Sequence, residues 1–172
     1  MMDGVIHIES QFGVGSSFIL ELHLPISIKN NLSVTDDNIT VKSLENEINV
    51  IENINILVAE DNKMNQTLLV MLLEDSKLNL EFAQDGAIAV EMFKKNNYDL
   101  ILMDIQMPNM NGYDATELIR EEDKEIPIIG LSANAMEDDV KKALESGMNS
   151  YVAKPIDIEK LYIELLKYIG KV

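Results

Sequence analysis

The chain has no cysteine, which excludes disulfide bonds and thiolate metal sites. Its two histidines, His7 and His23, both lie near the start of the chain and have no second ligand nearby, so a zinc site is not expected. No apolar run is long enough to span a bilayer, and the first residues lack the basic and apolar regions of a secretory signal. We therefore expect a cytoplasmic location and no membrane contact by this segment.

Basic residues are also scarce in this sequence. The 14 Lys and Arg residues are outnumbered by 30 Asp and Glu residues, and the formal net charge is −16. Proteins that bind nucleic acid contact its phosphates through clustered Lys and Arg, so nucleic acid is not an expected partner. Most of the negative charge is expected on a solvated acidic surface. A small part of it is expected in a cluster of carboxylates, where a cation would offset it.

The 172 residues, 47% of them hydrophobic, allow one domain with a core and an additional segment. Residues 1–26 predict two strands joined by a glycine-containing turn, and an isolated hairpin of this kind needs a partner surface for stability. Residues 27–53 are rich in Asn, Ser, Thr and acids. They are interpreted as a linker with one short helix, because Leu44, Ile48 and Ile51 recur at roughly helical spacing.

From residue 54 onward, strand patterns and helical patterns alternate five times. The first, third and fourth strand patterns are continuously apolar, as in strands covered on both faces, whereas the second alternates and predicts an edge strand. This alternation predicts an α/β domain over residues 54–172 with a doubly wound, five-stranded parallel sheet. The strands are expected at residues 55–59, 79–83, 100–103, 126–131 and 151–153.

Apolar residues at helical spacing fill the gaps between these strands. The clearest helix is expected over residues 158–169, with Asp157 as its N-cap and Gly170 as its stop signal. The first gap carries an apolar stripe formed by Met64, Leu68, Met71 and Leu72.

Polar residues follow the expected strands at the point where each strand ends: Glu60 and Asp61, Asp104, Ser132, and Lys154. The carboxyl ends of parallel strands meet at one edge of a sheet, so these side chains are expected to cluster. Mg²⁺ prefers carboxylate and carbonyl oxygens, and would leave one oxygen of Asp104 free to attack a phosphoryl group and form an acyl phosphate. Ser132 would donate a hydrogen bond to that group, and Lys154 would neutralise another oxygen.

Each of these residues also has a simpler explanation when it is considered alone. The acidic pair Glu60–Asp61 fits a solvated turn or a helix cap, Ser132 fits a turn, and Lys154 fits an ordinary surface position. Tyr151 fits a half-buried strand residue. The joint placement of five polar residues at one sheet edge nevertheless favours a site.

Residues 54–172 resemble a receiver (response regulator) domain of two-component signalling. The resemblance is carried by the acidic pair, by Asp104 within the segment Leu-Met-Asp-Ile-Gln-Met-Pro-Asn-Met-Asn-Gly, by Leu-Ser-Ala around Ser132, and by Lys154 before a proline. The family's aromatic switch position falls on Tyr151. The segment Asp-Asn-Lys-Met-Asn-Gln at residues 61–66 resembles the variant found in hybrid histidine kinases.

The resemblance implies a flavodoxin-like fold with strand order 2-1-3-4-5. It also implies that Asp61, Asp104 and the backbone carbonyl of Gln106 bind Mg²⁺, with Glu60 acting mainly through water. Asp104 would be the phosphoacceptor, and catalysis would rest on Asp104 with Ser132 and Lys154. Ser132 and Tyr151 would form a conformational switch. The implied partner is a histidine kinase or a histidine phosphotransfer domain, and a homodimer stays open.

Residues 2–18 resemble the end of the ATP-binding domain of a histidine kinase, of which only the last hairpin is present. The nucleotide-binding region and a phosphorylatable histidine motif are not found in the sequence. The resemblance therefore implies the C-terminal part of a hybrid sensor histidine kinase that is not a kinase by itself. The parent protein would be anchored to the membrane, if at all, through a region outside this sequence.

Three other classes remain as alternatives. A phosphatase of the haloacid-dehalogenase type also uses an aspartate at a strand end, but it needs a second acid two residues later, where this chain has Gln106. A binding-only receiver without phosphoryl chemistry is disfavoured by the complete set of polar residues. A flavodoxin-like cofactor protein would need a phosphate-binding glycine loop after the first strand, and none is present.

Overall fold

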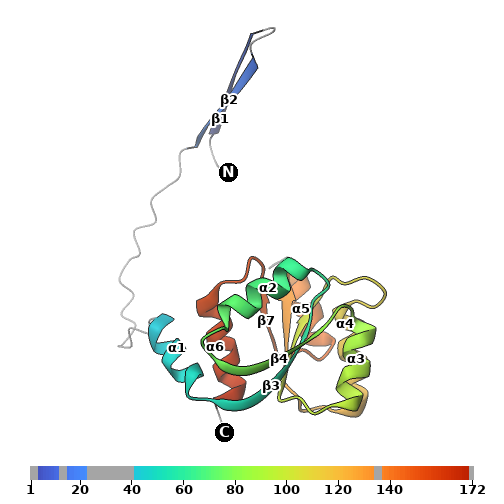
Figure 1. Cartoon of the computed structure of the whole chain (residues 1–172). Coiled ribbons are helices and arrows are strands. Elements are labelled where there is room, and N and C mark those ends of the chain that lie inside the picture. The colour runs from blue at the N-terminus through green and yellow to red at the C-terminus, as the bar shows by residue number, and fades with distance from the viewer. Residues whose placement is uncertain (1–3, 12–14, 23–40, 134–136, 171–172) are drawn as a thin grey trace. The chain divides into compact units, whose positions relative to one another are not determined.

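The computed structural model describes residues 4–11, 15–22, 41–133 and 137–170, and the chain forms two compact units, Met1–Asn38 and Ile39–Val172 (Figure 1). The first unit contains an antiparallel hairpin of strands β1 (Gly4–Gln11) and β2 (Gly15–Leu22). Two strands were expected here, and both are present. Residues 23–26, which include His23, and most of the expected linker lie outside the described residues.

The second unit is an α/β domain whose five strands are all parallel, in the order β4-β3-β5-β6-β7. Counted within this domain, the order is 2-1-3-4-5, as the resemblance to receivers implied. Its strands are β3 (Glu52–Ala59), β4 (Lys77–Ala83), β5 (Leu100–Asp104), β6 (Ile128–Ser132) and β7 (Ser150–Ala153). Its helices are α1 (Val41–Asn49), α2 (Lys63–Leu72), α3 (Gly86–Lys95), α4 (Gly112–Glu122), α5 (Glu137–Glu145) and α6 (Ile158–Ile169).

Helices cover both faces of the sheet and divide the core in two. One core packs α1, α2 and α6 against β3, β5, β6 and β7, and the other packs α3, α4 and α5 against the opposite face (Figure 1). Every residue of β5 and β6 is buried, whereas β4 alternates between exposed and partly buried residues. The continuously apolar and alternating patterns therefore identified the central strands and the edge strand correctly.

Helix α1 shows where the expected boundary differs from the compact unit. Residues 27–53 were interpreted as a linker, but Leu44 and Ile48 are buried in the core beside α6. The compact unit consequently begins at Ile39 rather than at residue 54. Hydrophobic burial stabilises this short helix, whose asparagines weaken its intrinsic propensity.

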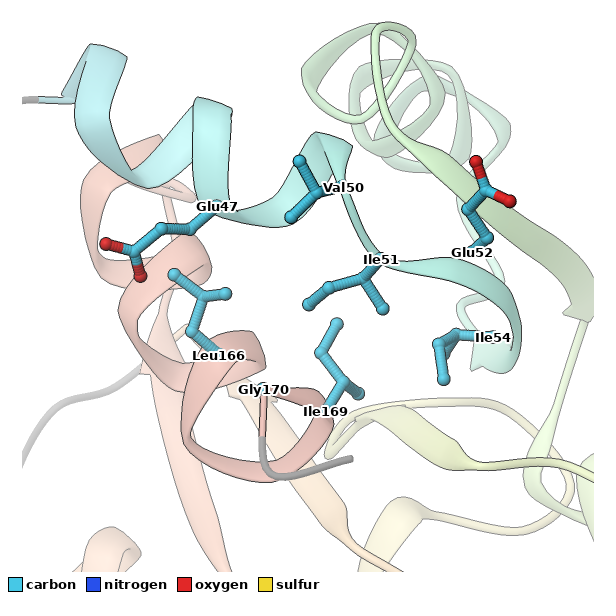
Figure 2. A pocket seen from close by; sticks show the side chains of 8 residues that line it. All are labelled: Glu47, Val50, Ile51, Glu52, Ile54, Leu166, Ile169 and Gly170. Carbon is cyan, nitrogen blue, oxygen red and sulfur yellow. The ribbon is translucent and has the colours of Figure 1, made fainter.

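A pocket of about 460 Å³ lies where the end of α1, the start of β3 and the end of α6 meet (Figure 2). Ile51, Ile54 and Ile169 contribute much of its apolar lining, and Val50 stands at its rim with 76% of its surface exposed. Glu47 and Glu52 add carboxylates to the lining.

The ends of α6 agree with the sequence pattern. Asp157 accepts hydrogen bonds from the backbone N–H groups of Glu159 and Lys160, and the helix stops at Gly170.

The apolar stripe of α2 lies largely outside the core. The side of α2 that faces the core is formed by Leu69, with Leu73 buried directly after the helix. The stripe residues Met64, Leu68 and Met71 are 80%, 39% and 65% exposed.

Arg120 connects the end of α4 to the turn before β7. Its guanidinium donates hydrogen bonds to the carbonyl oxygens of Gly147 (2.9 Å), Asp123 (3.1 Å) and Ile126 (2.7 Å) and to Oδ1 of Asn149 (2.8 Å). Burial lowers the pKa of this guanidinium, although the nearby carboxylates of Asp123 and Glu125 act in the opposite direction. Arg120 thus satisfies acceptors in two loops, the one between α4 and β6 and the one between α5 and β7.

We expect Arg120→Met to lower the free energy of unfolding by about 2–3 kcal/mol, because partly buried acceptors lose a charged donor while the apolar stem remains. Urea unfolding followed by circular dichroism measures this change. Lys124→Met removes an exposed cation from the same region and is the matched control. Equal stability of the two variants would contradict the assigned role of Arg120.

Candidate functional site

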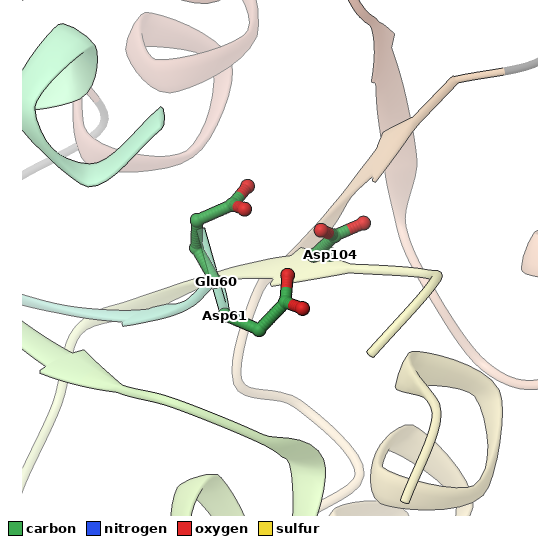
Figure 3. Close-up of side chains that lie close together, drawn as sticks. All are labelled: Glu60, Asp61 and Asp104. Carbon is green, nitrogen blue, oxygen red and sulfur yellow. The ribbon is translucent and has the colours of Figure 1, made fainter. Parts of the chain in front are cut away.

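Three carboxylates meet at the carboxyl edge of the sheet. Parallel pairing of β3 with β5 sets Ala59 opposite Met103, so the residues that follow β3 lie beside Asp104 at the end of β5. Glu60, Asp61 and Asp104 each offer a carboxylate oxygen within 4.8 Å of the others (Figure 3). Glu60 is fully buried and Asp104 is 5% exposed, whereas Asp61 is open to solvent.

Lys154 joins two of these carboxylates. It follows β7, precedes Pro155 through a cis peptide bond, and donates its backbone N–H to the carbonyl oxygen of Ser132. Its ammonium lies 2.6 Å from Oε2 of Glu60 and 2.7 Å from Oδ2 of Asp104. The carboxyl ends of β3, β5 and β7 therefore each place a charged group in one cluster.

The pKa values of the two central groups of the cluster are shifted by burial and by the contacts between them. It raises the pKa of the Asp104 carboxyl, and hydrogen bonds from Lys154 and from the N–H of Gln106 reduce this effect without reversing it. Burial also disfavours the charged form of Lys154. Its contacts with Asp104 and Glu60 outweigh that cost, so the pKa of its ammonium is raised and it stays protonated at neutral pH.

The carboxylate of Glu60 is enclosed by donors. Its Oε1 accepts hydrogen bonds from the N–H of Asn62 (3.1 Å) and from Nδ2 of Asn65 (2.9 Å), and its Oε2 is held by Lys154. The side chain of Gln66 donates to the backbone carbonyl of Glu60 (2.6 Å). Glu60 thus orients Lys154, whereas the carboxylates of Asp61 and Asp104 are less enclosed.

Asn65 and Gln66 were not identified as candidate site residues from the sequence. The signal available for them was their presence in the segment 61–66, which resembles hybrid histidine kinases. Their contacts with Glu60 depend on the tertiary structure, because α2 starts beside the cluster with its first turn facing Glu60.

The remaining expected residues lie at different distances from this cluster. Gln106 donates its backbone N–H to Oδ1 of Asp104 (3.1 Å). Ser132, which is 5% exposed, ends β6 and lines a pocket of about 450 Å³ together with Gln106. Tyr151 is half-buried on β7, opposite Gly130, and lines a separate hollow with residues of α6. The structure therefore places Tyr151 on a neighbouring face, outside the cluster.

The charges and ligand types of the cluster fit a divalent cation. Three ionised carboxylates and one ammonium leave two negative charges uncompensated when all four groups are charged. Their oxygens are hard ligands at a spacing suited to one small ion, and Asp61 opens the cluster to solvent. Carboxylate oxygens of this kind suit hard divalent cations, and Mg²⁺ is one of them.

Comparison with known proteins identifies a family for the α/β domain. A family model, the response regulator receiver domain, matches residues 56–166. The sensor protein EvgS of Escherichia coli K12 is 32% identical over 164 residues, which cover 95% of this chain but only 13% of that protein. The chain thus spans a small fraction of the length of this curated relative.

Solved structures agree with the sequence matches. The receiver domain of the sensor histidine kinase PA1611 from Pseudomonas aeruginosa, which has a magnesium ion coordinated in its active-site cleft, is 38% identical with a TM-score of 0.65. The match covers 69% of this chain and 99% of that one. The receiver domain of Saccharomyces cerevisiae Ssk1, solved with the histidine phosphotransfer protein Ypd1, is 32% identical with a TM-score of 0.66, covering 70% and 92% of the two chains.

Within the described residues, no helix is both long enough and apolar enough to cross a membrane.

The sequence and structure matches span the domain that carries the acidic cluster. The chain therefore belongs to the response regulator receiver domain family, whose members act in two-component phosphorelays.

Proposed function

We propose that Asp104 accepts a phosphoryl group from a phosphohistidine of a histidine kinase or a histidine phosphotransfer domain. The observation that carries this proposal is the shared contact of Lys154 with Asp104 and Glu60 at the acidic edge of the sheet. Lys154 keeps the buried Asp104 carboxylate paired with a positive charge, and the hydrogen bond from Gln106 fixes its other oxygen. The carboxylate is thereby oriented for attack.

The chemical step transfers phosphorus from nitrogen to oxygen. A carboxylate oxygen of Asp104 forms a bond to phosphorus while the bond between phosphorus and the imidazole nitrogen breaks, and the imidazole leaves with the electron pair. Lys154 and Ser132 then bind phosphoryl oxygens as cation and hydrogen-bond donor. Hydrolysis of the resulting acyl phosphate returns Asp104 to its carboxylate form, so this limited turnover is the only catalysis proposed for the chain itself.

Asp61, Asp104 and the backbone carbonyl of Gln106 would hold Mg²⁺, and Glu60 would contribute through water while it retains Lys154. When bound, Mg²⁺ neutralises the charge that accumulates on the transferred group. The fit rests on the three converging carboxylates and their surplus of negative charge.

Ser132 and Tyr151 would form the conformational switch. Ser132 ends β6, and Tyr151 lies on the neighbouring strand β7, with its partner Gly130 two residues before Ser132. A phosphoryl group on Asp104 would draw Ser132 toward it and vacate space, into which Tyr151 would turn. The face formed by α5, β7 and α6 would then differ between the two states.

The exposed stripe of α2 supports a docking role for this helix. Met64, Leu68 and Met71 expose apolar surface on the helix that begins two residues after Asp61. Solvent-exposed apolar side chains beside a reaction site favour contact with a partner. Since the Ssk1 receiver was solved in complex with a histidine phosphotransfer protein, we propose that a domain of this kind docks on α2 and presents its phosphohistidine to Asp104.

The longer protein would be a hybrid sensor histidine kinase, with residues 1–26 as the end of its ATP-binding domain, residues 27–53 as a linker and residues 54–172 as the receiver. The alignment with EvgS supports this order, because it covers 95% of the chain and thus extends beyond the receiver. The structure adds that the ordered domain includes α1, which lies within the proposed linker. The cytoplasmic location remains part of this proposal.

Incubation with acetyl phosphate and Mg²⁺ should add one phosphoryl group to the wild-type chain and none to Asp104→Asn, because the amide is a far weaker nucleophile. Intact-mass analysis measures the adduct, which EDTA should abolish. Equal labelling of both chains, or of neither, would contradict Asp104 as the phosphoacceptor. Steady turnover of an unrelated phosphomonoester would indicate a phosphatase instead.

We expect Lys154→Met to lower the free energy of unfolding by about 3 kcal/mol in EDTA, because Glu60 and Asp104 lose the cation that pairs them inside the protein. Mg²⁺ should restore part of the loss, since a bound cation replaces some of the missing charge. Urea unfolding with and without Mg²⁺ measures both effects. The exposed Lys160→Met on α6 serves as the control, and unchanged stability of Lys154→Met would refute the buried pairing.

Met71→Lys should slow phosphoryl transfer from phosphorylated Ypd1 roughly tenfold, as expected for loss of an apolar contact in an interface. Labelling by acetyl phosphate should stay unchanged, because that donor needs no protein interface. Leu144→Lys, an exposed apolar residue on α5, is the matched control. Parallel changes with both donors would argue for an effect on the site itself rather than on docking.

A further inference from the structure

Asp85 is a buried carboxylate outside the acidic cluster. It lies between β4 and α3 and is 7% exposed. Its Oδ1 accepts the backbone N–H of Ile88 (2.8 Å), which caps α3. This capping role accounts for only one of its two oxygens.

The other oxygen of Asp85 contacts the loop that follows the proposed phosphoacceptor. Its Oδ2 accepts a hydrogen bond from Nδ2 of Asn109 (2.8 Å), a residue 24 positions away in sequence. The adjacent Gly86 donates its N–H to the carbonyl oxygen of Met110 (3.1 Å). Two neighbouring bonds thus attach the turn before α3 to the tip of the loop after β5.

The base of the same loop is closed at Gly112. Its N–H donates to the carbonyl oxygen of Ile105 (3.0 Å), and a Cβ atom on Gly112 would lie 2.2 Å from the carbonyl oxygen of Asp104. Between this base and the tip lie the exposed Gln106 and Pro108 and, between these two, the half-buried Met107. Met107 and Met110 pack partly against the core, and Gln106 is held by its N–H bond to Asp104. The hydrogen bonds of Asp85 and Gly86 add to these contacts at the exposed tip of the loop.

We propose that Asp85 and Asn109 are positioning residues, whose hydrogen bond holds the loop so that the backbone carbonyl of Gln106 is oriented toward Mg²⁺. This inference rests on the proposed function, since it concerns the same cation. A loop ordered before the ion binds loses less conformational entropy on binding, so the hydrogen bond increases affinity without touching the ion.

The charge and backbone of the two residues suit this role. Hydrogen bonds from the N–H of Ile88 and from Asn109 hold the pKa of Asp85 below its usual range, so the contact is charge-assisted at neutral pH. Asn109 has φ = 61°, a left-handed conformation that Asn tolerates better than most residues and that Gly adopts without strain.

These features allow the hydrogen bond to be removed from either side. Asn109→Gly keeps the backbone conformation and deletes the amide. Asp85→Ser keeps a good N-cap for α3, while its shorter side chain no longer reaches Asn109. Asn79→Ala, which removes an exposed hydrogen bond to Asn55 on the edge of the sheet, is the matched control.

The test is isothermal titration of the full chain with Mg²⁺ alone, combined with thermal unfolding in EDTA. Each variant should raise the Kd about tenfold, the lower end of the effect of outer-shell partners on metal affinity, and the double variant should raise it no further. Labelling by acetyl phosphate at saturating Mg²⁺ should approach the wild-type rate, and the control should bind Mg²⁺ like the wild type.

Three results would overturn the inference. They are an unchanged Kd in both single variants, effects that multiply in the double variant, and slow labelling that saturating Mg²⁺ does not restore. The second would show that the two residues act independently, and the third that the loop affects the chemical step. A wild-type chain that fails to bind Mg²⁺ would overturn the proposed metal site and this inference with it.

Discussion

The ion pairs of Lys154 with Glu60 and Asp104 are the contacts on which the organisation of the site depends. A buried carboxylate without a partner is costly, and here two such groups lie side by side with almost no exposure. One ammonium at 2.6 and 2.7 Å offsets both, and it arrives from a strand that pairs with neither β3 nor β5. The cluster consequently forms only when β6 has paired with both β5 and β7, which brings Lys154 to the two carboxylates.

The rest of the domain serves to keep this edge in place. Helices bury both faces of β5 and β6, so the residues that follow these strands have well-defined positions. Hydrogen bonds help to hold the loops, from Arg120 at the end of α4 and from Asn109 to Asp85 near the cluster. A rigid sheet whose loops are held by specific hydrogen bonds suits a reaction in which the protein mainly orients charges.

Much of the fold followed from local patterns because those patterns report burial directly. Alternation in the second strand identified β4 as an edge, and Asp157 and Gly170 marked the ends of α6. The apolar stripe predicted the helix α2 correctly, although Met64 and Met71 within it are exposed. Periodicity shows that a helix has an apolar face, but it does not show whether the sheet or solvent lies beside that face.

The sequence by itself determined which polar groups stand at the strand ends, since strand length and hydrophobic pattern are local properties. It also gave the resemblance to receivers, which the family match confirms. Only the tertiary structure decided that Lys154 reaches Glu60 and Asp104, which lie 94 and 50 residues earlier, and that α1 belongs to the core. Such contacts depend on strand order and on packing between distant segments, which no local pattern encodes.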